Sequence, residues 1–507
     1  MFSSVLLCIL SGALYWAAFP PLDMGFAAWF ALIPFFFACK GKKPAQKIVL
    51  GFTAGITAFS LNLYWLYPTI RVTGESAILS FSAVILTGAF FALFTALWSL
   101  LSEEHSLYAA SSGVLLSWAG SKILWSVPWC PLYVSQASYP AMLQICSIAG
   151  PYFLTFLIIY ANHSFYRAVA MRRLRPLIPA ASLIALTLVF GIYKTGIPLD
   201  GEEYDICAVQ PNISQDIKWD KDNIDAVKDK IRLFTAASIA ADLTVFPEAV
   251  LPGIINYDAD ISIFISELES MKKKPSVLGA AFYGLEEDKK GDYRRVLKNS
   301  ALLLNPSPAS GDISGARQFY FKRKLVPFGE FVPFGEFLGR FIKVINTLGG
   351  FESGREAAIL KAGDLRIIPL ICSESVYPSL WRGDGNIAVN ITNDAWFGKT
   401  AAAEQHLRHV IVGAASFGIP AAFANNTGPS ALIDARGRVI RKSGMSEECS
   451  FTESVTLPAR ESFYGRNWDF TLAASALIAA YGLLIILRQK RVGALVFQRR
   501  FKWIKIC

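Results

Sequence analysis

The stretch LRIIPLICSES at residues 365–375 is an apolar run, interrupted only by Arg366, that ends at Cys372 and a group of polar side chains. A short apolar run between polar boundaries is typical of a strand buried inside a sheet. Domains of the α/β class place reactive groups where such strands end. The stretch therefore predicts a buried strand that carries a thiol at its carboxyl end.

Short β-rich runs and helical patterns alternate on both sides of this stretch. The β-rich runs are YDICAVQ (204–210), LTVF (243–246), SVLGAAF (276–282), SALLLN (300–305), NIAVNIT (386–392) and PAAFAN (420–425). The helical patterns lie near 222–241, 260–273 and 404–418. Strands that alternate with helices indicate an α/β or layered α+β domain. We assign this domain to residues 196–468, a length that suits one domain with its own core.

Long apolar segments flank the domain, and a transmembrane helix needs about 20 apolar residues. Eight candidates are 2–19, 24–39, 47–67, 78–101, 107–125, 143–166, 177–195 and 470–487. The first has no basic segment before it and more spans follow, so it is interpreted as a retained helix and not a signal peptide. The sequence therefore predicts a multi-pass membrane domain of seven helices over 1–195, and an eighth helix with a basic tail over 469–507.

Composition and charge agree with a membrane protein. Of the 507 residues, 53% are hydrophobic and 17% are charged, and the mean hydropathy is +0.40. Soluble domains average about a quarter charged residues, so a soluble enzyme and a disordered chain are both excluded. The net charge of +10 comes largely from alternate loops between the spans and from the tail. The positive-inside rule puts those loops in the cytoplasm and 196–468 on the periplasmic side of the inner membrane. Nucleic acid is not an expected partner.

The sequence offers little support for a metal or nucleotide site. The eight cysteines form no CxxC pair, which argues against structural zinc. His406 and His409 stand three residues apart on a predicted helix. No cysteine or carboxylate ligand accompanies them, so a pair on the helix surface is favoured over a metal site. Neither GxGxxG nor a P-loop occurs, and we expect no cofactor and no metal.

Two further stretches bring reactive side chains to predicted strand ends. LTVFPEAVLPG (243–253) contains Glu248, and FYFKRKLVPFGEFVPF (319–334) contains Lys322 and Glu330. A cysteine, a glutamate and a lysine suit acyl transfer: the thiolate attacks a carbonyl, the carboxylate moves the proton, and the ammonium with backbone N–H groups holds the oxyanion. From these residues alone, a packing role for Cys372 is commoner than a catalytic one, because a cysteine that ends an apolar strand usually packs as a small hydrophobic side chain.

The order of the motifs FPEAVLPG, K-x-x-L-V-P-F-G-E-F, ICSES and NITNDAWFG resembles the nitrilase (carbon–nitrogen hydrolase) superfamily. The apolar spans, together with AFPPLDMGFAAWFALIPF (18–35) and VPWCPLYVSQASYP (127–140), resemble one branch of it, the bacterial apolipoprotein N-acyltransferases. The resemblance covers essentially the whole chain. It implies that 196–468 is a nitrilase-like α-β-β-α sandwich.

The resemblance also implies roles for individual residues. Glu248 would be the general base, Lys322 the oxyanion-stabilising lysine and Cys372 the nucleophile. Lys322 is preferred to Lys324 because the family lysine stands three residues before the leucine of LVPFGE. Glu330 matches a second glutamate of the family, which would hold the ammonium of Lys322 and tune the pKa values of Lys322 and Cys372.

Three weaker assignments complete the predicted site. Glu374 matches a functional position of the family, and Ser373 stands where relatives commonly have tyrosine. Trp219 matches an aromatic residue over the acyl-chain entrance, although a core tryptophan is nearly as good an interpretation. The apolar segment 338–351 is either a membrane-dipping arm or a core helix of the domain.

The implied reaction uses a phospholipid as acyl donor and a diacylglyceryl apolipoprotein as acceptor. An acyl thioester on Cys372 would link the two half-reactions, with no cofactor, in a protein expected to be a monomer. A membrane-tethered amidase that hydrolyses a small C–N substrate is the alternative, and its catalytic residues would be the same. A non-enzymatic membrane scaffold or transporter is the third hypothesis.

Overall fold

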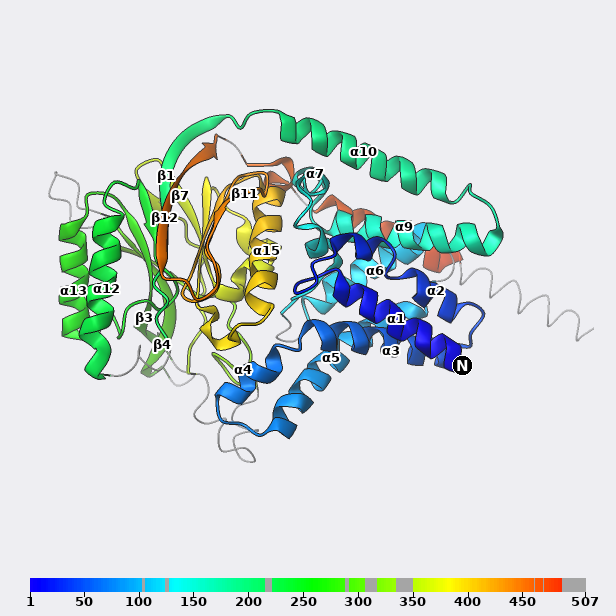
Figure 1. Cartoon of the computed structure of the whole chain (residues 1–507), viewed down its shortest axis with the longest axis horizontal. Coiled ribbons are helices and arrows are strands. Elements are labelled where there is room, and N and C mark those ends of the chain that lie inside the picture. Colours follow the sequence, from blue (N-terminus) through cyan, green and yellow to red (C-terminus); the bar gives the residue numbers. More distant parts are fainter. Residues whose placement is uncertain are drawn as a thin grey trace, which may run out of the picture.

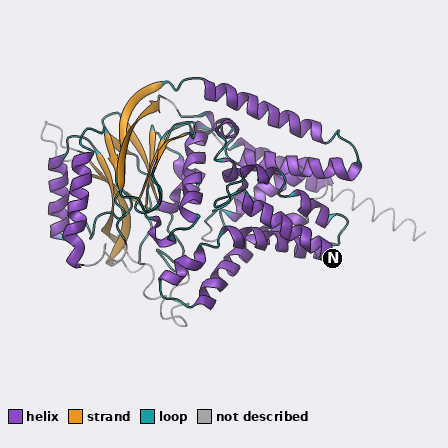
Figure 2. Cartoon of the chain, in the orientation of Figure 1, coloured by secondary structure: helices purple, strands orange, loops and turns teal. Residues whose placement is uncertain are grey.

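A computed structural model describes residues 1–102, 105–123, 127–214, 221–287, 291–305, 317–333, 350–459, 461–467 and 469–485. The amino-terminal part is helical, and the following part is built of strands with helices on both outer faces (Figures 1 and 2). Trp219 and residues 338–349 of the apolar segment 338–351 lie outside the described residues. The predictions made for them therefore have no structural counterpart.

The helical part is a bundle of apolar helices joined by short turns (Figure 1). Its elements are α1 (Phe2–Ala17), η1 (Gly25–Trp29), α2 (Ile33–Cys39), α3 (Pro44–Asn62), α4 (Leu66–Val72), α5 (Ala77–Ser99), α6 (Ser106–Gly120), η2 (Leu132–Gln136), α7 (Pro140–Leu143), α8 (Cys146–Ala149), α9 (Tyr152–Met171) and α10 (Leu177–Gly196). A further helix, Phe470–Ile485, follows the strands.

By length and composition, the described helices include fewer candidate membrane spans than the eight predicted. Among the described residues, Ala77–Ser99 and Leu177–Gly196 are long and apolar enough to cross a bilayer. The number rises to four if two bent helix pairs each count as one span. The segments 24–39 and 143–166 are not continuous helices. The first is a 3₁₀ turn followed by the short α2, and the second breaks at Gly150, whose φ is +79°.

Two six-stranded sheets form the centre of the α/β part. The first has the order β12-β1-β2-β3-β4-β5, with β1 (Gly201–Gln210), β2 (Leu243–Val245), β3 (Ser276–Glu287), β4 (Tyr293–Leu304), β5 (Arg317–Phe321) and β12 (Cys449–Pro458). The second has the order β11-β10-β9-β8-β7-β6, with β6 (Leu360–Ala362), β7 (Leu365–Ile371), β8 (Ile387–Thr392), β9 (Ala421–Asn425), β10 (Ala431–Ile433) and β11 (Val439–Lys442).

The two sheets face each other and helices cover their outer faces. Apolar side chains from both sheets, such as Val245 and Ile371, form one buried cluster between them. The helices α12 (Ile224–Ala237) and α13 (Ala259–Met271) pack on the first sheet. Helix α15 (Ala402–Phe417) packs on the second sheet (Figure 1). The seven β-rich runs and three helical patterns of the sequence all correspond to elements of this α-β-β-α arrangement.

Helix α15 lies between the second sheet and the helical part (Figure 1). All but two of its side chains are buried. His406 and His409 are 0% and 3% exposed, so the interpretation of these histidines as a surface pair is wrong. The error arises because a helix that is covered on two sides has no face toward solvent. The spacing of apolar residues along the helix does not reveal the second covering layer.

Candidate active site

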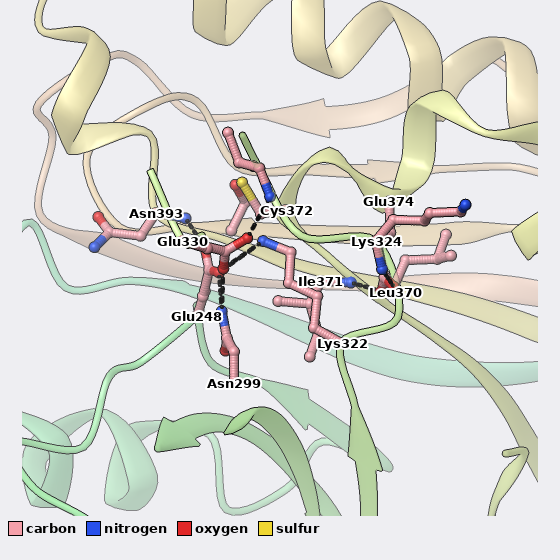
Figure 3. Close-up of polar contacts among 12 residues, drawn as sticks. Glu248, Asn299, Lys322, Lys324, Glu330, Leu370, Ile371, Cys372, Glu374 and Asn393 are labelled. Atoms are coloured by element: carbon pink, nitrogen blue, oxygen red, sulfur yellow. Dashed lines mark hydrogen bonds and ion pairs between the residues drawn. The ribbon is translucent and has the colours of Figure 1, made fainter. Parts of the chain in front are cut away.

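Sheet topology brings the ends of three strands together. Strands β1, β2 and β3 are parallel, and β5 runs in the same direction as β3 because β4 is antiparallel to both. The carboxyl ends of β2 and β5 therefore lie at one edge, where Glu248 and Lys322 follow them. Cys372 follows β7 of the facing sheet. Figure 3 shows the carboxylates of Glu248 and Glu330, the Lys322 ammonium and the Cys372 sulfur facing one another.

Glu248 is 7% exposed and both of its carboxylate oxygens accept hydrogen bonds. Oε1 accepts from Nδ2 of Asn299 at 2.7 Å, and Oε2 accepts from the backbone N–H of Asn393 at 3.0 Å. The second bond links the two sheets, because Asn393 follows β8. Glycine is required at position 279, since a Cβ atom there would lie 2.5 Å from the Cα atom of Glu248. Backbone and side chains thus fix this carboxylate in one position.

Lys322 is almost fully buried, with 1% of the residue exposed. Its Nζ atom lies 2.9 Å from Oε1 of Glu330 and 3.5 Å from Oε1 of Glu248. Burial acts to lower the pKa of Lys322, but the carboxylates of Glu330 and Glu248 outweigh it, and the pKa stands well above the usual 10.5. The side chain is therefore a permanent ammonium at neutral pH. Such a group can stabilise a negative charge that develops beside it.

Asn299 joins the two carboxylates and was not predicted from the sequence. Its Nδ2 atom donates to Glu248 at 2.7 Å and to Glu330 at 2.9 Å, and its backbone carbonyl accepts from the N–H of Lys322 at 2.9 Å. It lies on β4, one residue before the apolar run SALLLN. A polar side chain directly before the apolar half of a strand is the only local signal it gives.

Cys372 begins the 3₁₀ turn η6 (Cys372–Val376) with a φ of +52°. Few residues other than glycine adopt this left-handed backbone, and such strain is concentrated at functional sites. Burial raises the pKa of the thiol well above 9.0, and the nearby Glu248 raises it further, while Lys322 opposes both. The resting side chain is therefore a neutral thiol. It has to lose its proton before it can act as a nucleophile.

Glu374 is fully buried but contacts no reacting group. Its Oε1 atom accepts from the backbone N–H groups of Arg323 and Lys324 at 2.7 and 3.1 Å, and Oε2 accepts from that of Ile371 at 2.9 Å. It therefore holds the turn after Lys322 against the strand end before the cysteine. Burial raises the pKa of this carboxyl above 4.5.

The remaining predicted residues occupy different positions. Ser373 is 4% exposed and lies inside the turn that follows the cysteine. The ammonium of Lys324 lies 5.9 Å from the centre of the Tyr377 ring and points away from the carboxylates (Figure 3). The structure therefore brings Lys322, and not Lys324, to Glu248 and Glu330.

Comparison with known proteins covers both parts of the chain. A family model described as Apolipoprotein N-acyltransferase N-terminal domain matches residues 11–164, and one described as Carbon-nitrogen hydrolase matches residues 206–459. A Geobacter metallireducens protein named apolipoprotein N-acyltransferase is 31% identical, over 96% of this chain and 96% of the relative. The chain belongs to the apolipoprotein N-acyltransferase family.

Other apolipoprotein N-acyltransferases are similar over comparable lengths. That of Allorhizobium ampelinum is 28% identical over 94% of this chain and 96% of its own length. That of Pasteurella multocida is 25% identical over 98% and 96%. Family membership makes this protein an acyltransferase on a nitrilase-like α/β fold, and its apolar helices agree with a membrane protein.

Proposed function

We propose that the protein moves an acyl chain from a phospholipid, through a thioester on Cys372, to the α-amino group of the diacylglyceryl-cysteine that begins an apolipoprotein. The observation that carries this proposal is the buried cluster in which the carboxylate of Glu248 and the ammonium of Lys322 face the Cys372 thiol. We assign Glu248 as general base, Lys322 as oxyanion stabiliser and Cys372 as nucleophile.

In the first half-reaction the Cys372 sulfur attacks the carbonyl carbon of a phospholipid ester, such as the sn-1 ester of phosphatidylethanolamine. A C–S bond forms, the thiol proton passes to Glu248, and the carbonyl electron pair moves onto oxygen beside Lys322. The tetrahedral intermediate then expels the glycerol oxygen, which takes the proton back from Glu248. The products are a lysophospholipid and an acyl thioester.

In the second half-reaction the α-amino group of the apolipoprotein attacks the thioester carbonyl. A C–N bond forms, the C–S bond breaks, and the proton lost by the amine returns the sulfur to the thiol through Glu248. An ester is exchanged for an amide without ATP. Because water would compete with the amine, the site has to exclude it, and the low exposure of Glu248 and Lys322 supports that requirement.

Membrane placement is the second element of the proposal. Residues 1–195 would form seven transmembrane helices, 196–468 a periplasmic catalytic domain, and 469–507 an eighth helix and a cytoplasmic tail of a monomeric inner-membrane protein. The alternation of basic and non-basic loops supports this topology. Apolar helices shorter than the bilayer can still cross it where the local bilayer thins or where neighbouring segments extend the helix.

Mass spectrometry of the intact purified protein tests the reaction. After incubation with phosphatidylethanolamine, we expect a mass increase of one acyl chain on Cys372, and its loss when a diacylglyceryl peptide is added. The variant Cys372→Ser should form no thioester, whereas Cys449→Ala, which removes another partly buried cysteine, should react normally. Release of ammonia from small amides without any acyl adduct would instead favour the tethered amidase.

A further inference from the structure

His406 lies directly behind the nucleophile although it contacts no reacting atom. Its Nε2 atom is 3.0 Å from the backbone carbonyl oxygen of Cys372, and its Nδ1 atom is 3.2 Å from Oδ1 of Asp394. Both side chains are fully buried. The Phe423 ring packs edge-on against the imidazole with a centroid distance of 5.2 Å, and this apolar contact keeps water from one side of it.

The partners of the ring connect it to two backbone and side-chain acceptors. A carbonyl oxygen only accepts, so the contact with Cys372 is a hydrogen bond when Nε2 carries a proton. On the other side of the ring, the Asp394 carboxylate faces Nδ1 and also accepts from Nδ2 of Asn425 at 2.7 Å and from the hydroxyl of Thr392 at 3.0 Å. The His406 ring is thus held between the Asp394 carboxylate and the Cys372 carbonyl.

The hydroxyl of Ser375 also contacts the ring and the carbonyl. It lies 3.0 Å from Nε2 of His406 and donates to the carbonyl oxygen of Cys372 at 3.4 Å. The carbonyl also accepts from Nδ2 of Asn390 at 3.1 Å, so three polar side chains surround one backbone oxygen.

This carbonyl belongs to the peptide group whose N–H is that of Ser373. In acyl transfer, the N–H that follows the nucleophile is placed to bind the oxyanion. A hydrogen bond to the carbonyl end draws electron density from the whole peptide group. It therefore strengthens the N–H as a donor and also holds the peptide in the left-handed turn that Cys372 requires.

We propose that His406 and Asp394 are positioning residues that orient and polarise the Cys372–Ser373 peptide so that the Ser373 N–H stabilises the oxyanion. This inference rests on the proposed acyl transfer. A purely packing role would not need two buried polar side chains, because burying polar groups is costly and apolar side chains of similar volume would fill the space. His406 instead contacts the backbone carbonyl of the residue that carries the reacting sulfur.

The test compares two reactions of the same thiol. Acylation by phosphatidylethanolamine passes through an oxyanion, whereas alkylation by iodoacetamide is a displacement without one. In His406→Asn, which keeps a polar side chain without Nε2, we expect single-turnover acylation to slow by about tenfold or more. The alkylation rate, the KM for the phospholipid and the melting temperature should stay near those of the unsubstituted protein.

A matched control is His409→Asn on the same helix. His409 is also buried and lies 2.6 Å from a backbone carbonyl, that of Trp129, but it is not next to the nucleophile. Cys372 of the His409→Asn variant should be acylated at the normal rate. Asp394→Asn, which keeps the size of the side chain and removes its charge, should slow acylation but not alkylation, and it serves if His406→Asn does not fold.

Each outcome decides a different point. If His406→Asn loses acylation and alkylation equally, or if His409→Asn slows acylation as much as His406→Asn does, the role is structural and the inference is overturned. Unchanged acylation in both His406→Asn and Asp394→Asn would overturn it as well. No adduct on the unsubstituted protein would instead refute the proposed function. Nitrogen NMR of the histidine-labelled protein should show a proton on Nε2 of His406, and a bare Nε2 would contradict its hydrogen bond to the Cys372 carbonyl.

Discussion

Nε1 of Trp129 donates a 2.7 Å hydrogen bond to Oε1 of Gln405, joining the segment before η2 to the first turn of α15. The same oxygen accepts from Nε1 of Trp65 at 3.0 Å, and Nε2 of Gln405 donates to the backbone carbonyls of Pro20 and Asn62. One buried side chain thus connects the catalytic part to three segments of the helical part. His406, the next residue, faces the nucleophile from the same turn.

We expect Gln405→Leu to destabilise the protein, because it leaves two indole N–H groups and two carbonyls without their partner. A buried polar group that loses its partner costs about 1–3 kcal/mol. Thermal unfolding should show a clearly lower melting temperature. The neighbouring variant Glu404→Gln removes a partly exposed ion pair with Lys442 and should have a small effect. Equal melting temperatures for the two variants would contradict this role of Gln405.

We expect Asn299→Leu to slow acylation by on the order of a hundredfold, since it removes the donor shared by Glu248 and Glu330 and leaves two carboxylates facing each other around a single lysine. Single-turnover acylation measures the effect. Asn256, whose Nδ2 donates to the Tyr283 carbonyl at an exposed position, provides the control variant Asn256→Ala. An Asn299→Leu protein with normal acylation would show that the Asn299 bridge has no catalytic role.

The raised pKa of Cys372 predicts that replacing Glu248 changes the rates of alkylation and acylation in opposite directions. Burial and then Glu248 raise this pKa, while Lys322 lowers it. In Glu248→Gln the carboxylate charge is gone, so the thiolate fraction at a given pH should rise and iodoacetamide alkylation should become faster. Acylation should nevertheless fall, because the general base is lost.

The complementary variant is Lys322→Met, in which the thiol pKa should rise further. Both alkylation and acylation should then become slower. In the unsubstituted protein the alkylation rate should keep rising with pH beyond 9.0, since the folded thiol titrates above its usual value. A plateau below that pH would contradict the raised pKa.

Glu374→Gln should lower stability and both thiol reactions together. Its carboxylate accepts from three backbone N–H groups that flank Lys322 and Cys372, and an amide has only one oxygen for them. A loss of about 1–3 kcal/mol is expected, measured by chemical unfolding. Selective loss of acylation, with alkylation and stability intact, would show that Glu374 acts on the oxyanion and not on the backbone.

The sequence predicted the strands well, because strands depend on local patterns. It also placed Glu248, Lys322 and Cys372 at strand ends, and the structure brings these three residues together. LRIIPLI matches β7 in full, and Cys372 stands at its end as expected. It did not predict Asn299, since a single polar residue at the start of an apolar run has many possible partners. The prediction of eight spans rested on hydropathy alone. Hydropathy does not detect the left-handed backbone at Gly150, which ends a helix within an apolar segment.

By itself, the sequence determined the family resemblance, the layered α/β domain beside apolar helices, and the order of Glu248, Lys322 and Cys372 along the chain. Only the tertiary structure decided which side chains meet. The Asn299 bridge and the burial of Gln405 and His406 all depend on segments that are far apart in sequence. Such contacts form when two sheets and a helical bundle pack around one helix, and burial without water is what makes each polar partner necessary.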